Sequence, residues 1–175
     1  GLQYSHLYAP RKLRQSVYVR RKVGDKEVFV PDLNLIQDIE QPSVIHSPII
    51  GWSYDGAPIY GPYGYSDNSG GPIKILESGY SASISSIRPN PLTVTGEQIY
   101  SEGFFVEDYT YDGGGDLDEH NGRFCKTPEY PNGVYAYFSL INPTINDDDG
   151  SFKNYRRPQF PYFIGNSYKY QPIDY

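Results

Sequence analysis

The chain has 175 residues and a mass of 19.9 kDa, which predicts one domain with a hydrophobic core of its own. Its one cysteine excludes an internal disulfide and a cysteine-rich zinc site, and its net charge of -6 argues against sequence-independent binding of nucleic acid. No apolar run is long enough for insertion into a membrane, and the lack of methionine favours a segment of a longer protein.

The secondary structure is expected to be mainly β, because 18 glycines and 15 prolines interrupt nearly every window in which a helix could form. The first predicted element is a hairpin with strands at 16–20 and 27–30 and a turn at Gly24 and Asp25. One or two helical turns are predicted at 32–40. We expect residues 1–45 to form an N-terminal hairpin with a connecting segment.

Residues 46–165 are predicted to form the main domain, in which aromatic residues alternate with turn residues. Within residues 46–65 we expect two short strands joined by a turn at Asp55 and Gly56. The further predicted elements are a polar loop at 66–71, an irregular excursion at 81–97, strands at 104–111, 133–140 and 160–164, and a polar loop at 142–157. Residues 166–175 are predicted to be a tail. The expected fold is one compact antiparallel β-rich domain with long loops and little helix.

The densest group of polar residues lies in the stretch 112–123, where carboxylates are placed among flexible glycines. Asp116, Asp118 and Glu119, with Asp55 from the earlier turn, are candidate ligands for a hard cation such as calcium. Their spacing departs from that of the regular helix-loop-helix calcium loop. The alternative is that Asp and Gly form turns here, with the carboxylates bonded to nearby amides. The acidic stretch 146–150 could likewise bind a cation, and the alternative is a solvated loop.

The histidines and the cysteine are weaker candidates for chemistry. His46 and His120 could form an acid–base or metal pair, but a hydrogen-bonded structural role is the alternative for two residues so far apart in sequence. Cys125 follows His120 closely, yet a buried cysteine usually acts as a small hydrophobic residue. The sequence contains neither a serine-hydrolase elbow nor a phosphate-binding loop. No catalytic residue is therefore assigned.

The 19 tyrosines are the other unusual feature, because tyrosine combines a large contact area with a polar tip. Trp52, Tyr54, Tyr60 and Tyr63 are the candidate contact surface, for sugar or for protein. The alternative is that many of these aromatic residues build the core, because hydrophobic residues make up only 38% of the chain.

Several ordered motifs resemble those of the YHYH-domain family. They are SPIIGW at 47–52, DGAPIYG at 55–61, EDY at 107–109, GDLDEHNGR at 115–123, TPEYPNGVYAY at 127–137 and FPY at 160–162. The resemblance covers roughly residues 47–165. The Tyr-His-Tyr-His stretch that names the family is absent, and its nearest counterpart is Tyr135-Ala136-Tyr137-Phe138. If those histidines serve a metal or catalysis in other members, this chain has lost that role.

Within the family, the chain is most similar to domains of large virion structural proteins of tailed phages that infect marine cyanobacteria. This likeness implies a structural or adhesion module of the tail, baseplate or fibre, located in the virion. Its expected partners are other virion subunits, copies of itself or host-surface glycan, with no role in nucleic-acid binding or membrane insertion.

Two further functions stay open from the residues. One is a metal-assisted hydrolase of surface glycan or peptide that uses Asp116, Asp118, Glu119 and His120. The other is a carbohydrate-binding module that uses Trp52 and the tyrosines. The resemblance assigns no catalytic residue. It suggests a polar centre that consists of Asp55, Asp116, Asp118, Glu119, Asn121 and Arg123.

Overall fold

A computed structural model describes residues 20–23, 26–29, 44–82, 92–96, 100, 103–142 and 158–172. The helical turns predicted at 32–40 and the acidic stretch 146–150 lie outside the described residues. So does most of the predicted excursion at 81–97 and nearly all of the predicted loop at 142–157. Within the described part of the chain, no helix is long and apolar enough to cross a membrane.

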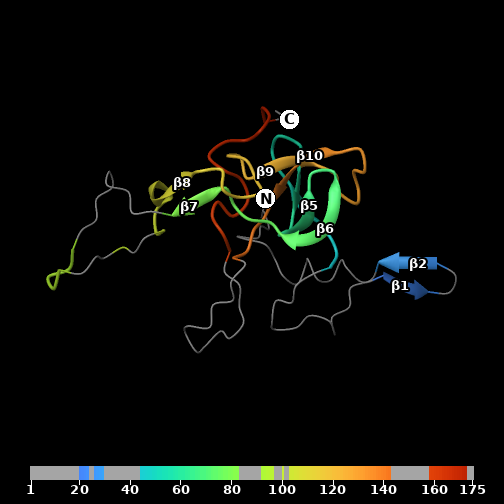
Figure 1. Ribbon diagram of the computed structural model, residues 1–175, viewed down its shortest axis with the longest axis horizontal. Helices are drawn as coiled ribbons and strands as arrows, with labels where there is room; N and C mark the ends of the chain where they lie inside the picture. The colour runs from blue at the N-terminus through green and yellow to red at the C-terminus, as the bar shows by residue number, and fades with distance from the viewer. Residues whose placement is uncertain are drawn as a thin grey trace, which may run out of the picture.

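The predicted N-terminal hairpin is confirmed for the strands at 20–23 and 26–29, whereas residues 16–19 of its predicted first strand lie outside the described residues. Strand β1 (Arg20–Val23) pairs antiparallel with β2 (Lys26–Phe29), and Val23 lies opposite Lys26. This register leaves two residues between the strands, as a tight hairpin requires. In Figure 1 the hairpin lies apart from the other strands.

The main sheet has four strands in the order β3-β4-β10-β9. They are β3 (Ile49–Trp52), β4 (Pro58–Tyr60), β10 (Val134–Phe138) and β9 (Gly122–Cys125). The outer pairs are antiparallel, but β10 runs parallel to β4 in the centre. The mainly β prediction is therefore confirmed, and the strand predicted at 133–140 is β10. The turn predicted at Asp55 and Gly56 joins β3 to β4, with Gly56 at φ 82°.

Three smaller predictions were wrong. The polar loop expected at 66–71 is the end of a hairpin, because β5 (Tyr63–Asp67) pairs with β6 (Gly70–Ile75). The strand expected at 104–111 is interrupted by a 3-10 turn at Val106–Asp108, and only β8 (Tyr109–Tyr111) is extended. The buried Asp108 carboxylate accepts the N–H of Phe105 at 3.2 Å and stabilises this turn. Strand β8 pairs with β7 (Tyr80–Ala82) in a separate sheet.

The third error concerns residues 160–164, which form turns in place of the predicted strand. The Tyr162 N–H donates to the Gln159 carbonyl at 2.9 Å, and Tyr162 has φ 74°. A left-handed backbone conformation does not fit an extended strand. Beyond this turn, Ser167, Lys169 and Tyr170 form hydrogen bonds with His120, Tyr137 and Asp55, respectively, so this part of the predicted tail is attached to the domain.

Strand β10 separates two different layers of side chains, because successive residues of a strand point to opposite faces. Ala136 and Phe138 belong to an apolar cluster with Tyr60, Leu76, Leu117, Cys125 and Leu140. Tyr135 and Tyr137 pack with Ala57 on the other face, where Ile59, Ile164 and Tyr168 border them. The two faces are called the apolar face and the tyrosine face below.

Candidate functional site

The candidate site is a pair of carboxylates on the tyrosine face, each bonded to one tyrosine of β10. The Tyr137 hydroxyl donates to Oδ2 of Asp55 at 2.6 Å. The Tyr135 hydroxyl lies 2.8 and 3.0 Å from the two carboxylate oxygens of Asp118. The rings of Tyr135 and Tyr137 are 5.3 Å apart and nearly perpendicular. The alternation of tyrosine in β10 therefore brings together two acids that are far apart in sequence.

Asp55 is held at the β3–β4 turn and is only 7% exposed. Besides Tyr137, its carboxylate accepts hydrogen bonds from the Ser53 hydroxyl, the Ala57 N–H at 3.3 Å and the Tyr170 N–H at 3.2 Å. Burial is the largest single effect and disfavours the charge, but these hydrogen bonds together outweigh it and lower the pKa of Asp55. The carboxylate is thus stabilised in its ionised form by the fold itself.

Asp118 organises the turn that leads into β9. Its Oδ1 accepts the N–H groups of His120 at 3.0 Å and Gly122 at 3.2 Å. Its backbone N–H donates to the Gly122 carbonyl at 2.8 Å, and its carbonyl accepts the N–H of Asn121 at 2.9 Å. The carboxylate therefore stabilises the local turn and also contacts β10 through Tyr135.

The C-terminal residues Lys169 and Tyr170 complete the site. The Lys169 N–H donates to the Tyr137 hydroxyl at 2.7 Å. Its ammonium lies 3.3 Å from Oδ2 of Asp118 and 5.3 Å from the centre of the Tyr135 ring. Burial, followed by the bonds to the carboxylates, raises the pKa of Tyr135 and of Tyr137. Both hydroxyls consequently remain protonated donors at neutral pH.

Asn121 connects this site to the rest of the chain. Its fully buried amide donates to the carbonyl of Phe138 at 2.8 Å and to that of Phe163 at 2.9 Å. Asn121 has φ 65°, a left-handed conformation that asparagine adopts more readily than most residues. One side chain therefore joins the end of β10 to the C-terminal turn.

The other predicted acids point to different partners. Asp116 pairs with the Lys74 ammonium at 2.8 Å and accepts the N–H of Glu77 at 2.9 Å, so it binds the β6 side of the fold. Glu119 is exposed, 3.4 Å from His120. In the described ranges, no three His, Cys, Asp or Glu side chains form a group that could hold a metal ion. The calcium site predicted from Asp55, Asp116, Asp118 and Glu119 therefore finds no support in the geometry.

The histidines take separate structural roles. The buried His46 ring lies 2.7 Å from the Ser47 carbonyl through Nδ1 and packs at 5.1 Å against the ring of Tyr60 on the apolar face. Burial is the main cause that lowers the pKa of His46. His120 contacts the Ser167 carbonyl at 3.0 Å. The hydrogen-bonded alternative for both histidines fits these contacts.

Arg123 and Cys125 of β9 also belong to the apolar face. Arg123 is buried, donates to the Tyr65 carbonyl at 2.6 Å and lies 5.6 Å from the centre of the Phe138 ring. Cys125 is part of the apolar cluster, and burial raises the pKa of its thiol. A thiol that is kept protonated is a poor nucleophile. Arg123 therefore does not join the carboxylates of the tyrosine face, although the sequence grouped them.

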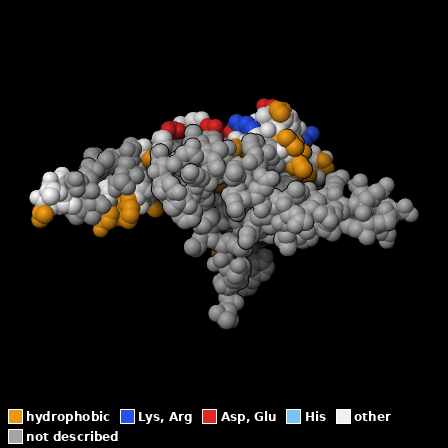
Figure 2. All heavy atoms as spheres, turned by 90° about the horizontal axis from the view of Figure 1, so that it is seen from below, with side chains coloured by type: hydrophobic (Ala, Val, Ile, Leu, Met, Phe, Trp, Pro, Cys, Tyr) orange, Lys and Arg blue, Asp and Glu red, His pale blue; other side chains and the backbone are white. Residues whose placement is uncertain are grey.

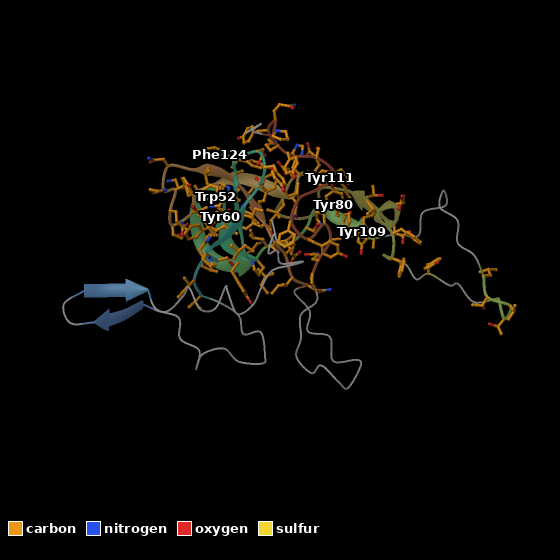
Figure 3. All side chains as sticks on the ribbon, turned by 180° about the vertical axis from the view of Figure 1, so that it is seen from behind. Trp52, Tyr60, Tyr80, Tyr109, Tyr111 and Phe124 are labelled. Carbon is orange, nitrogen blue, oxygen red and sulfur yellow. The ribbon has the colours of Figure 1, made fainter. Side chains whose placement is uncertain are left out.

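The four residues of the predicted contact surface differ in their exposure. Trp52 and Tyr54 are 57% and 66% exposed, whereas Tyr60 and Tyr63 are 0% and 2% exposed and belong to the core. In Figure 3 Trp52, Tyr60 and Phe124 lie at the main sheet, and Tyr80, Tyr109 and Tyr111 lie at the β7–β8 pair. The Tyr60 hydroxyl lies 2.9 Å from both Thr127 and Glu129, which explains how a tyrosine is accommodated in the core.

Sequence reasoning missed Tyr135, Tyr137, Lys169 and Tyr170 as site residues. The alternation of tyrosine in β10 was a usable signal for the first two, because it places both hydroxyls on one face. Lys169 and Tyr170 carry no local signal, since their partners are distant in sequence. A model of the family described as YHYH protein matches residues 26–148, more than half of the chain. No curated protein and no solved structure gives a significant match.

Proposed function

The chain belongs to the YHYH protein family, and we propose that it serves as a non-enzymatic structural or adhesion module of a tailed-phage virion, in the tail, baseplate or fibre. The family match supports the fold, and the likeness of the motifs to phage virion proteins supports the context. In this role its partners are other virion subunits, further copies of the chain, or glycan on the host surface.

The non-enzymatic role is supported by the contacts of the carboxylates, which form hydrogen bonds and ion pairs with other parts of the chain. Asp55 and Asp118 are each occupied by a tyrosine hydroxyl, by backbone N–H groups and by the C-terminal residues. Asp116 is paired with Lys74. Acid–base chemistry needs carboxylates that can approach a substrate, whereas these carboxylates stabilise turns and join segments.

The place of the name-giving stretch supports the same conclusion. If Tyr135-Ala136-Tyr137-Phe138 is matched to Tyr-His-Tyr-His position by position, Ala136 and Phe138 occupy the places of the two histidines. Both side chains are fully buried in the apolar cluster. The tyrosines of the motif are thus retained on the tyrosine face, while the histidine positions contribute to the core.

Exposed aromatic residues supply surfaces for contacts with other subunits or with a host. Trp52 and Phe124 lie on β3 and β9, the two edge strands of the main sheet, and both are exposed. Phe104 and Val106 are exposed beside β8. Figure 2 shows several groups of hydrophobic side chains on the face in view, with charged side chains along one rim. Exposed aromatic residues are typical of interfaces, and symmetric copies in a particle would bury them repeatedly.

The test of this proposal is the composition of the particle. Peptides of the chain should be found by mass spectrometry in gradient-purified particles, and an antibody against the domain should label the tail, baseplate or fibre in electron micrographs. Lysate from which particles have been removed is the control. Particles that lack these peptides would contradict the proposal.

A carbohydrate-binding module is the second candidate, favoured by the exposure of Trp52 and Tyr54 at neighbouring positions of β3 and its turn. Stacking of a sugar ring on Trp52 predicts that Trp52→Ala removes binding on a glycan array. Phe124→Ala, which removes an exposed aromatic residue from the opposite edge strand, is the matched control. Equal binding by the wild-type protein and Trp52→Ala would reject this candidate.

A further inference from the structure

Residues 166–172, called the strap here, lie on the tyrosine face through a set of polar contacts. The N–H groups of Lys169 and Tyr170 donate to the Tyr137 hydroxyl at 2.7 Å and to Asp55 at 3.2 Å. The Lys169 ammonium lies 3.3 Å from Asp118, above the Tyr135 ring. Tyr168 and Tyr170 place their rings at 6.4 Å from Tyr54 and at 5.7 Å from Tyr135, respectively.

These contacts recognise a peptide of defined chemistry. The N–H groups of two consecutive residues donate to Tyr137 and Asp55. The lysine side chain contacts the carboxylate of Asp118 and the ring of Tyr135. Charge-assisted hydrogen bonds and cation–π contacts are strong and directional. The tyrosine face therefore accommodates a Tyr-Lys-Tyr segment, and in this structure the chain's own strap occupies it.

The strap is attached without deep burial. Tyr170 is 52% exposed and Lys169 is also exposed, whereas Tyr168 is half-buried beside Ala57, Tyr135 and Tyr137. The chain just before it is packed much more tightly. The Gly165 N–H donates to the His120 carbonyl at 2.9 Å, and a Cβ at Gly165 would lie 2.1 Å from the Glu119 carbonyl oxygen. The strap can consequently leave the face while the chain up to Gly165 stays in place.

We propose that the tyrosine face is an intermolecular docking site and that it takes the Tyr168-Lys169-Tyr170 segment from a second copy of the chain. The structure shows that this sequence fits the face, and an identical segment from a neighbour offers the same donors and the same charge. Exchange of an identical element is a low-cost route to association. With Gly165 in place, the four residues that lead to Lys169 reach about 13 Å when extended, so the neighbouring copy must be in direct contact.

In dilute solution the chain's own strap prevails, because a short tether gives an effective concentration in the millimolar range. Exchange needs copies held close together, or a copy whose own strap cannot dock. This inference goes beyond the proposed function and is testable without a phage particle, so its failure would leave the particle assignment unchanged.

The experiment mixes two complementary variants of the full chain. Lys169→Pro removes the N–H to Tyr137 and the ammonium at Asp118, which leaves an open face. Tyr137→Phe combined with Asp118→Asn weakens the face and leaves the strap intact. Each variant alone should sediment as a monomer, and a mixture at about 1 mM of each should form a 1:1 complex. A mixture that stays monomeric, or a complex of equal size in either variant alone, would overturn the proposal.

The matched control replaces Lys169→Pro with Gln171→Pro, a change two residues along in the exposed strap that removes neither the Lys169 contacts nor the Tyr170 N–H. This variant keeps its own strap docked, so the mixture should remain monomeric. If Lys169→Pro fails to fold, as judged by its circular dichroism, Tyr170→Pro takes its place, since it removes the N–H to Asp55 and the ring beside Tyr135 but keeps the lysine.

A second measurement titrates the peptide Asn-Ser-Tyr-Lys-Tyr-Gln-Pro, residues 166–172, into the Lys169→Pro variant. Saturable binding is expected, and a peptide with alanine in place of lysine should bind about tenfold more weakly, as expected for the loss of one charge-assisted contact. Absence of saturable binding at millimolar peptide would overturn the proposal. Equal affinity of the two peptides would overturn the assigned role of the lysine.

Discussion

The two faces of β10 are built from alternate residues of one strand and are stabilised by different physical effects. On the apolar face, Ala136 and Phe138 pack into a cluster of buried side chains. On the tyrosine face, Tyr135 and Tyr137 hold two carboxylates and the strap through hydrogen bonds. Burial of apolar area is not directional, whereas hydrogen bonds to charged groups require exact partners.

The two kinds of position in β10 should therefore differ in the substitutions that they tolerate. An apolar position accepts other side chains of suitable volume. A hydroxyl that donates to a carboxylate has no apolar substitute, because its removal takes away one of the hydrogen bonds that stabilise the charge. The two faces should therefore respond differently to mutation and to pH.

The largest effect is expected on the apolar face. Phe138→Ala should lower the free energy of unfolding by about 3–5 kcal/mol, since it leaves a cavity in the apolar cluster. Denaturant unfolding followed by fluorescence measures the change. Phe124→Ala in the neighbouring strand is the control, and its side chain is exposed, so its effect should be much smaller. Equal losses for the two variants would show that the apolar face does not hold the fold.

Asn121 connects the two faces, and its replacement should rank second. Asn121→Ala leaves the carbonyls of Phe138 and Phe163 without their amide donor and places alanine at φ 65°. A loss of about 2–3 kcal/mol is expected from unsatisfied buried groups and backbone strain. Asn121→Gly removes the same donor without the strain, so it should unfold at a higher denaturant concentration than Asn121→Ala. The reverse order would contradict the assigned backbone role.

Removal of one hydroxyl from the tyrosine face should have a smaller effect. Tyr137→Phe deprives Asp55 of a donor and the Lys169 N–H of an acceptor, and a loss of about 1–2 kcal/mol is expected. Tyr54→Phe is the matched control, because it removes a hydroxyl from an exposed side chain. A Tyr137→Phe protein as stable as Tyr54→Phe would mean that the hydroxyl pair contributes nothing to the fold.

The smallest predicted effect is the pH dependence of the tyrosine face. The pKa of Asp55 is lower in the folded protein than its ordinary value of 3.8, so the unfolded chain takes up a proton first. The stability that ionised Asp55 contributes is therefore complete above pH 3.8 and is lost as the pH falls through the folded-state pKa. Asp55→Asn should show a shallower loss of stability below pH 3.8 than the wild-type protein. An equal or steeper acid loss in the variant would contradict this assignment.

Local patterns were sufficient to predict the elements that depend on neighbours in sequence. The turn at Asp55 and Gly56 follows from turn chemistry, and β10 follows from its alternation of residue types. The same alternation also determines which residues of β10 share a face. These are features that a few consecutive residues specify, and the structure agrees with them.

The features that could not be predicted from the sequence depend on contacts between residues that are far apart in the chain. Asp116 and Asp118 are separated by one residue, yet one binds Lys74 and the other binds Tyr135, because the turn between them points the two side chains in different directions. Likewise, Trp52 is exposed and Tyr60 is buried because β3 is an edge strand of the main sheet, whereas β4 lies inside it. The strap has no local pattern, since its contacts join Tyr170 to Asp55 across most of the chain.

The most direct test of the tyrosine face is amide hydrogen exchange at Lys169 and Tyr170, measured by NMR. Both N–H groups donate to the Asp55–Tyr137 pair, so both should exchange more slowly than in an unstructured peptide of the same sequence. In Tyr137→Phe the Lys169 amide should lose most of this protection, because its acceptor is gone. Exchange of both amides at the rate of the unstructured peptide in the wild-type protein would contradict the account.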